Sequence, residues 1–290
     1  MAWRLAMAMD PPITFISWNG KHAPRPQPPT LLQTAMEERL SFDDPLGHRV
    51  SAILTVPDNG TDRIAVLCHG FLSSKTSSTN NALTRSLVDH GVGTFRFDFF
   101  GQGESDGPFE QITTTLGVEQ AQAAIDLMKE KGYRRIGLMG SSFGGLVATL
   151  TASQRTDLTC LALKCPVVDF AEELRLGFGP DEMAHWKATD TIPNIMGDPE
   201  RIRLRYSFYE DAMRQIAYDP ARTITAPTVI VQGDKDEHVP LHQSQQLYAA
   251  LRVKKHLEML PGADHQFTKG EDFKRMTTVI ADWLIQHLTV

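Results

Sequence analysis

Cysteine is scarce in this sequence, which holds three among 290 residues. Three cysteines are too few for a disulfide framework. Cys160 and Cys165 lie on one predicted strand with an odd spacing, so their side chains should point to opposite faces and are poorly placed to bridge. Together with Cys68, which ends another apolar run, they are predicted to be small buried thiols of a protein in a reducing compartment.

Long hydrophobic runs and basic runs are missing as well. No stretch approaches the roughly 20 apolar residues of a membrane helix, and the apolar start MAWRLAMAM is short for the core of a signal peptide. The formal net charge is −6, with no basic–aromatic stripe of the kind that binds nucleic acid. The histidines, cysteines and acids show no metal-ligand spacing. We therefore predict a cytoplasmic protein with no membrane span, no nucleic-acid partner and no metal.

Short strand-like runs alternate with amphipathic helical segments along most of the chain. Two alternating runs, 34–42 and 48–57, are typical of antiparallel strands. Further strands are predicted within 63–70, 93–99, 134–140, 158–166, 227–233 and 255–262, and helices near 79–90, 115–131, 143–154, 241–251 and 272–288. Strands separated by helices imply an α/β fold with a mostly parallel central sheet.

One interval, between Pro166 and Pro227, holds no strong strand signal and is far longer than an ordinary connection. It is rich in aromatic residues, namely Phe178, Trp186, Tyr206, Phe208 and Tyr209. It can be a helical insertion with a small core of its own, a lid over a pocket, or both. The expected organisation is a proline-rich arm (1–33), a core (34–166 and 223–290) and a cap insertion (167–222).

The segment LMGSSFGGLVA contains the pattern G-x-S-x-G with Ser142 at its centre. Centring the pattern on Ser141 would need glycine where Met139 and Phe143 stand. A strand precedes the pattern and a helix follows it, which is the context of a nucleophile elbow. Ser142 is therefore the predicted nucleophile.

A serine nucleophile needs a base, and the base needs an acid that orients it. GDKDEHVP and GADHQF both follow predicted parallel strands, at the same sheet edge as the elbow. We predict Asp236 as the acid and His265 as the base, in the order Ser–Asp–His found in hydrolases. Asp234 and Glu237 stay open as alternatives for the acid. His238 and Asp264, which lie beside the predicted pair, are interpreted as loop and turn residues.

The oxyanion of the reaction needs two hydrogen-bond donors. The backbone N–H groups of Phe143, which follows the nucleophile, and of Phe71 in the segment HGF are predicted to supply them. Gly70 permits the backbone turn that this requires, and His69 is expected to hydrogen-bond within the same turn. The glycines of FDFFGQGESDG resemble a dinucleotide fingerprint, but Pro108 follows and no helix opens on them, so no nucleotide cofactor is predicted.

The motifs HGF, DFFGQGESDG, GSSFGG, GDKDEHVP and GADHQF follow one another as in the α/β-hydrolase superfamily, which the chain resembles from about Glu37 onward. Within it the sequence is most similar to bacterial cinnamoyl/feruloyl esterase-type and lysophospholipase-like (S33-like) serine hydrolases. The resemblance implies an α/β-hydrolase fold with a helical cap, a Ser-His-Asp triad and no cofactor. It nominates Tyr209 in SFYEDA as a substrate contact, and the aromatic cap residues Trp186 and Phe178 are further candidates.

The predicted activity is hydrolysis of small-molecule carboxylic esters, with aryl or medium-chain acyl groups, through an acyl-enzyme. C–C bond hydrolases, thioesterases and aminopeptidases use the same triad and remain alternatives, as does a ligand receptor that retains a hydrolase pocket. Dehalogenases and epoxide hydrolases of this fold carry aspartate at the elbow, so Ser142 argues against them. The sequence leaves a homodimer open.

Overall fold

The computed structural model describes residues 35–190, 192 and 203–290. All of them belong to one compact unit, Leu32–Val290. The arm predicted for residues 1–33 lies outside the described residues. No helix in these described ranges is both long and apolar enough to cross a membrane.

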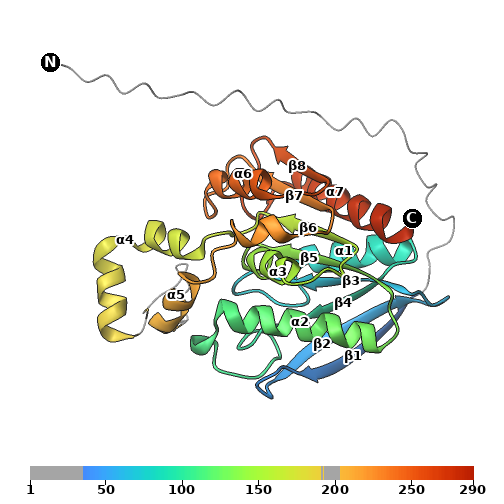
Figure 1. The fold of residues 1–290 in the computed structure, drawn as a ribbon, viewed down its shortest axis with the longest axis horizontal. Helices are drawn as coiled ribbons and strands as arrows, with labels where there is room; N and C mark the ends of the chain where they lie inside the picture. Colours follow the sequence, from blue (N-terminus) through green and yellow to red (C-terminus); the bar gives the residue numbers. More distant parts are fainter. Residues whose placement is uncertain (1–34, 191, 193–202) are drawn as a thin grey trace. The chain divides into compact units, whose positions relative to one another are not determined.

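One eight-stranded sheet forms the centre of the described part of the chain (Figure 1). Its strands are β1 (Ala35–Asp43), β2 (Arg49–Pro57), β3 (Arg63–Cys68), β4 (Gly93–Phe97), β5 (Arg135–Ser141), β6 (Cys160–Lys164), β7 (Thr228–Gly233) and β8 (Lys255–Leu260). They lie in the order β1-β2-β4-β3-β5-β6-β7-β8. The strands β3 to β8 run parallel, while β2 pairs antiparallel with both β1 and β4. The predicted antiparallel pair and mostly parallel sheet are confirmed.

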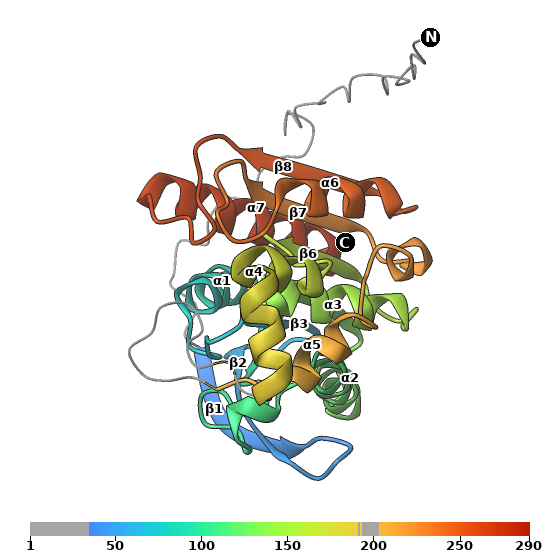
Figure 2. The same ribbon diagram turned by 90° about the vertical axis from the view of Figure 1, so that its left-hand side faces the viewer.

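Helices cover both faces of the sheet, because the parallel connections each need a crossover. The helices are α1 (Ser78–Asp89), α2 (Thr114–Glu130), α3 (Phe143–Ser153), α4 (Phe170–Thr189), α5 (Tyr206–Ala212), α6 (Leu241–Ala250) and α7 (Gly270–Thr289), with short 3₁₀ turns at Phe109–Gln111 and Pro220–Thr223. Successive residues of a strand point to opposite faces of the sheet, so the buried strand residues fall into two hydrophobic clusters, one on each face. One packs against α2, α3 and α6, and the other packs against α1 and α7 (Figure 2).

The cysteines show where the strand interpretation was wrong. All three are buried and free, as expected of buried thiols. However, β6 ends at Lys164, and Cys165 lies beyond it with φ of 39°. This turn brings Cys165 into the same hydrophobic cluster as Cys160, not to the opposite face.

The long interval between β6 and β7 is helical where the structure describes it. It contains α4 and α5, which lie together beyond one end of the sheet (Figure 1). Trp186 is buried at 1% exposure, and its Nε1 donates to the Leu204 carbonyl oxygen at 2.7 Å. The rings of Phe178, Tyr206 and Tyr209 each pack against the Trp186 ring, with centroids 6.2, 5.4 and 6.2 Å from it. These rings are continuous with the main hydrophobic cluster, and Phe208 packs against Phe71, Phe143 and Phe170. The interval therefore extends the main core and does not build a separate one.

Candidate active site

The turn after β5 holds Ser142 in a backbone conformation that few residues adopt. Its φ and ψ are 54° and −117°. The Ser142 N–H donates to the Lys164 carbonyl oxygen at 2.9 Å, and the Ser142 carbonyl oxygen accepts from Gly145 and Val167. A non-glycine residue with positive φ costs of order 1 kcal/mol and persists where its surroundings fix it. The strain lifts the serine hydroxyl out of the sheet edge, as in a nucleophile elbow.

The glycines around Ser142 are required by space. A Cβ on Gly144 would lie 2.4 Å from the backbone oxygens of both Cys68 and His69, and one on Gly140 would lie 2.1 Å from the Gly144 oxygen. Real Cβ atoms do not approach backbone this closely, so the elbow could not pack against β3 with larger residues here.

We expect Gly144→Ala to destabilise the fold by about 3 kcal/mol or more, because the new methyl group meets rigid backbone. Thermal or urea unfolding would measure the loss. Gly177→Ala is the matched control, since nothing lies within 4 Å of a Cβ built there. Equal stability of the two variants would contradict the close packing of the elbow.

His265 contacts both Ser142 and Asp236. It lies after β8, and its Nε2 is 3.1 Å from the Ser142 hydroxyl oxygen. Its Nδ1 is 2.8 Å from Asp236 Oδ2, in the loop after β7. The three residues follow three parallel strands, whose carboxyl ends meet at one sheet edge. The structure therefore brings the three predicted residues together in the predicted order.

Asp236 is the carboxylate that meets the imidazole. Asp236 also accepts N–H groups of His238 and Val239, and the Gln232 side-chain amide. Burial opposes its ionisation, but the hydrogen bond and charge of His265 and these backbone donors outweigh burial and lower the Asp236 pKa to about 2. The two other acids considered as partners of the imidazole have different contacts. Asp234 accepts the Gly262 N–H, and Glu237 accepts the backbone N–H of His265.

The other residues beside the predicted pair have separate contacts. Asp264 accepts the Thr268 N–H at 2.9 Å, so its interpretation as a turn residue is confirmed. His238 lies in the loop after β7, and its ring packs edge-on against that of His265, with centroids 5.1 Å apart. No described hydrogen bond joins His238 to Ser142.

The loop after β3 brings Phe71 close to Phe143. Phe143 is the first residue of α3, so its N–H has no carbonyl partner within the helix. The two phenylalanine rings pack edge to face at 5.5 Å. His69 closes the turn: its Nε2 accepts the Phe99 N–H, so Nδ1 carries the proton and donates to the Gly70 oxygen at 2.7 Å. Burial lowers the His69 pKa to about 4, which keeps the ring neutral, and the predicted turn hydrogen bond is confirmed.

A cavity of about 780 Å³ opens above Ser142 and His265. This is within the usual range for a small-molecule site. Its apolar wall is formed by Phe71, Leu72, Phe170, Leu174, Leu176, Phe178 and Leu204, four of which lie on α4. Of the three predicted substrate contacts, Phe178 lines this cavity. Trp186 and Tyr209 are not among the described lining residues, since both are buried in the main hydrophobic cluster. The Tyr209 hydroxyl accepts a hydrogen bond from Arg175 at 3.1 Å.

Two charged residues of the cavity wall were missed by sequence reasoning. Lys164, at the end of β6, is buried and donates through Nζ to the His265 carbonyl oxygen at 3.0 Å. Burial lowers its pKa. A lysine that ends the otherwise apolar run LALK was the available signal. Glu173 lies in the first turn of α4, where acidic residues are common helix formers, so nothing in the sequence set it apart.

Glu173 is an unusual carboxyl group. Its Oε2 is buried and has no hydrogen-bond partner among the described residues. Burial, and to a smaller extent the Asp236 charge, raises the Glu173 pKa to about 8. The side chain therefore stays protonated at neutral pH in the folded protein.

We expect Glu173→Gln to remove part of the pH dependence of stability. An unfolded glutamate ionises near pH 4.3, whereas folded Glu173 keeps its proton up to about pH 8. The folded state thus binds the extra proton between these values, and its stability falls as pH rises through this window. Thermal unfolding at pH 5 and pH 8 should show a smaller loss of Tm for the glutamine variant than for the wild type. Identical pH profiles would contradict the buried, protonated state.

The sheet order, the elbow after β5 and the residues at the carboxyl edge define the class of protein: the chain has the α/β-hydrolase fold. The sequence profile of the prolyl oligopeptidase family matches residues 80–290. The chain therefore belongs to the prolyl oligopeptidase family.

Individual relatives are distant. Est1E from Butyrivibrio proteoclasticus, solved with ferulic acid bound, superposes with a TM-score of 0.76 at 24% identity, covering 87% of this chain and 100% of that one. An uncharacterised 31.7 kDa protein of Escherichia coli is 23% identical over 283 residues, 85% of this chain and 99% of its own. Human mitochondrial palmitoyl-protein thioesterase ABHD10 is 23% identical over 227 residues, 76% of this chain and 72% of its own.

Proposed function

We propose that the protein is a serine hydrolase that cleaves carboxylic esters through an acyl-enzyme. The observation that carries this proposal is the hydrogen-bonded chain from Ser142 through His265 to Asp236 at the floor of a cavity. A hydroxyl, an imidazole and a buried carboxylate in this order form the unit that activates serine for attack on acyl groups.

In the proposed reaction, His265 Nε2 takes the hydroxyl proton as Ser142 Oγ attacks the ester carbonyl carbon. Asp236 holds the proton of Nδ1 and stabilises the imidazolium ion. The tetrahedral intermediate then collapses, the C–O bond to the alcohol breaks, and the imidazolium gives its proton to the leaving oxygen. Water repeats the sequence on the acyl-enzyme, with His265 again as base, and releases the acid.

We assign the oxyanion to the backbone N–H groups of Phe71 and Phe143. The support is their position: the Phe143 amide is free of intrahelical bonding, and Phe71 lies on the loop that packs against it. Loss of one such donor typically costs about 3 kcal/mol of transition-state stabilisation.

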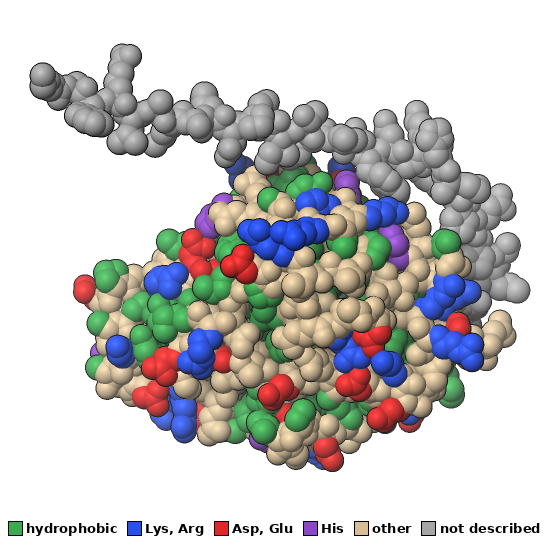
Figure 3. Space-filling model, viewed as in Figure 1, with side chains coloured by type: hydrophobic (Ala, Val, Ile, Leu, Met, Phe, Trp, Pro, Cys, Tyr) green, Lys and Arg blue, Asp and Glu red, His purple; other side chains and the backbone are tan. Residues whose placement is uncertain are grey.

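We propose that residues 167–222 form a cap that selects the substrate. Hydrophobic side chains gather over α4 and α5 on the face seen in Figure 3. Leu176 on α4 is exposed, as are Met213 and Ile216, which follow α5 in the sequence. Leu176 also lines the cavity, so the apolar surface continues inward. This favours an aryl or medium-chain acyl group, and a protonated Glu173 could donate a hydrogen bond to a polar substituent on it.

A thioesterase is the second candidate, because the relative ABHD10 is named as a palmitoyl-protein thioesterase. Est1E, which shares the fold, was solved with ferulic acid bound. Amide hydrolysis is a third outcome to test, given the family name.

The free buried cysteines support a location in the reducing cytoplasm. A homodimer remains a prediction.

A panel of acyl donors tests the proposal. We would compare kcat/KM for p-nitrophenyl esters of increasing acyl length, a methyl hydroxycinnamate, an acyl thioester and an aminoacyl p-nitroanilide. We expect multiple turnover of oxygen esters, with the highest kcat/KM at aryl or medium-chain acyl groups. Greater kcat/KM for the thioester or the anilide would move the assignment to that class, and the absence of turnover beyond one equivalent would indicate a receptor.

A further inference from the structure

The loop over residues 69–77, which joins β3 to α1, carries the Phe71 amide in a strained conformation. Leu72, the next residue, has φ of 53°. A leucine in this left-handed region costs of order 1 kcal/mol and needs surroundings that hold it there. Leu72 also lines the catalytic cavity. The position of the Phe71 N–H therefore depends on whatever fixes this loop.

The segment over residues 98–105 fixes the loop at three points. The Phe99 N–H donates to His69 Nε2 at 3.1 Å. The Ser73 N–H donates to Gln102 Oε1 at 3.2 Å, and the Lys75 N–H donates to Asp98 Oδ1 at 2.6 Å. These attachments stand on both sides of Phe71 in the sequence. The segment FDFFGQGESDG, whose glycines resemble a dinucleotide fingerprint, thus holds the loop over residues 69–77, which we call the oxyanion loop.

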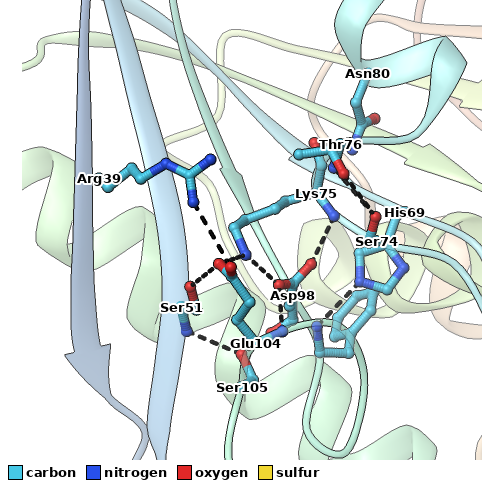
Figure 4. A network of polar contacts seen from close by, with 11 residues as sticks. Arg39, Ser51, His69, Ser74, Lys75, Thr76, Asn80, Asp98, Glu104 and Ser105 are labelled. Atoms are coloured by element: carbon cyan, nitrogen blue, oxygen red, sulfur yellow. Dashed lines mark hydrogen bonds and ion pairs between the residues drawn. The ribbon is translucent and has the colours of Figure 1, made fainter.

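The side chains of Lys75 and Asp98 add a buried ion pair to this backbone hydrogen bond (Figure 4). Lys75 is 3% exposed and Asp98 is fully buried. The Lys75 ammonium bonds to Asp98 Oδ2, and to Glu104 Oε2 at 2.8 Å. Asp98 Oδ2 also accepts the Glu104 N–H at 2.9 Å. Gly103 leaves room for this carboxylate, because a Cβ there would lie 2.2 Å from it.

A buried ion pair is a poor source of net stability, since removing both charges from water offsets most of their attraction. An apolar pair, however, could not accept hydrogen bonds from the backbone, as this carboxylate does. One carboxylate accepts backbone N–H groups from two loops, at Lys75 and Glu104, while the ammonium neutralises it. The pair therefore fixes the backbone of the oxyanion loop relative to the end of β4.

We propose that Lys75 and Asp98 are positioning residues for the oxyanion hole. They do not touch the substrate; they hold residues 69–77 in the strained conformation that aims the Phe71 N–H at the reacting carbonyl. This inference rests on the proposed ester hydrolysis. Misplacement of a donor by about 1 Å can cost on the order of 10²-fold in rate.

Asp98→Asn tests the proposal. The asparagine keeps the shape and, with its amide oxygen in place of Oδ1, the acceptor for the Lys75 N–H, but its NH2 group in place of Oδ2 accepts from neither the ammonium nor the Glu104 N–H. We expect kcat to fall about 10- to 100-fold, with KM within about twofold. The affinity for an alkyl boronic acid, which forms a tetrahedral adduct on serine, should fall by a similar factor. Unchanged kcat and boronate affinity would overturn the proposal.

A double variant separates positioning from general stability. Lys75→Met/Asp98→Asn leaves no unpaired buried charge at the site, because Glu104, which loses the ammonium, is exposed and still lies 3.6 Å from Arg39. The Tm of the double variant should therefore exceed that of Asp98→Asn while kcat stays low. Recovery of kcat together with Tm would show a merely structural role. Arg39→Met is the control, since Arg39 reaches only the exposed end of the network at Glu104, 3.6 Å away; its kcat should match the wild type.

Hydrogen exchange makes the outcome independent of activity. Peptides from residues 69–77 should exchange faster in Asp98→Asn than in the wild type, while peptides from α3 should not change. If the wild type neither turns over esters nor binds the boronate, the proposed function fails, and this exchange still decides whether the pair holds the loop. Equal exchange in loop 69–77 would overturn the inference on its own.

Discussion

Replacement of Ser142 by alanine should abolish ester turnover, with kcat falling on the order of 10⁶-fold. The hydroxyl is the atom within 3.1 Å of His265 Nε2, and the strained backbone at Ser142 exists to present it. The variant should fold normally, because alanine adds no atoms to the elbow.

A fluorophosphonate probe gives the second measurement. It should label the wild type covalently and leave Ser142→Ala unlabelled. Ser141→Ala is the control: that neighbouring serine ends β5, where it pairs in register with Lys164, and its loss should leave labelling intact. Labelling that persists in the Ser142 variant would mean that the nucleophile is elsewhere.

Asp236→Asn should lower kcat by about 10⁴-fold with a smaller effect on KM. The asparagine keeps the size of the side chain but offers no carboxylate charge to stabilise the imidazolium. Its amide can also hold His265 in the wrong tautomer, with the proton on Nε2 facing Ser142. The Asp236 pKa of about 2 means that the wild-type carboxylate is ionised throughout the working range of pH.

Asp234→Asn is the matched control for this variant. Asp234 lies two residues away in the same loop, but its carboxylate accepts the Gly262 N–H and does not reach the imidazole. We expect its kcat to stay near the wild-type value. Near-normal turnover of Asp236→Asn would require another acid, and Glu237, which accepts the His265 backbone N–H, would be the next to test.

The pKa of Asp236 also has a consequence for stability. A carboxyl group whose folded pKa is depressed stabilises the protein above its unfolded value, near 3.9, and this contribution is lost as pH falls toward about 2. Glu173 acts in the opposite direction at higher pH, because its folded pKa is raised to about 8. The Asp236 contribution is lost below about pH 3.9 and the Glu173 contribution is lost between about pH 4.3 and pH 8, so together the two groups favour the folded state most near pH 4.

Local patterns in the sequence were sufficient to predict the fold and the order of the candidate residues. Alternation of β-branched runs with amphipathic segments places every strand of the sheet, since strand and helix periods differ. Parallel strands then put the residues that follow them, including Ser142 and His265, at one edge. The glycine requirement at Gly140 is likewise local, because a Cβ there would meet the backbone oxygen of Gly144 within the same elbow.

Contacts between distant segments were decided only by the tertiary structure. The choice of Asp236 over its two acidic neighbours depends on where the loop after β7 points. Trp186 is buried because Leu204 and other distant residues of the main hydrophobic cluster pack against it. The raised pKa of Glu173 and the buried pair of Lys75 and Asp98 depend on burial by residues far along the chain. Periodicity and spacing report on which face or edge a residue occupies, whereas its solvent exposure and partners are set by segments that the local pattern does not contain.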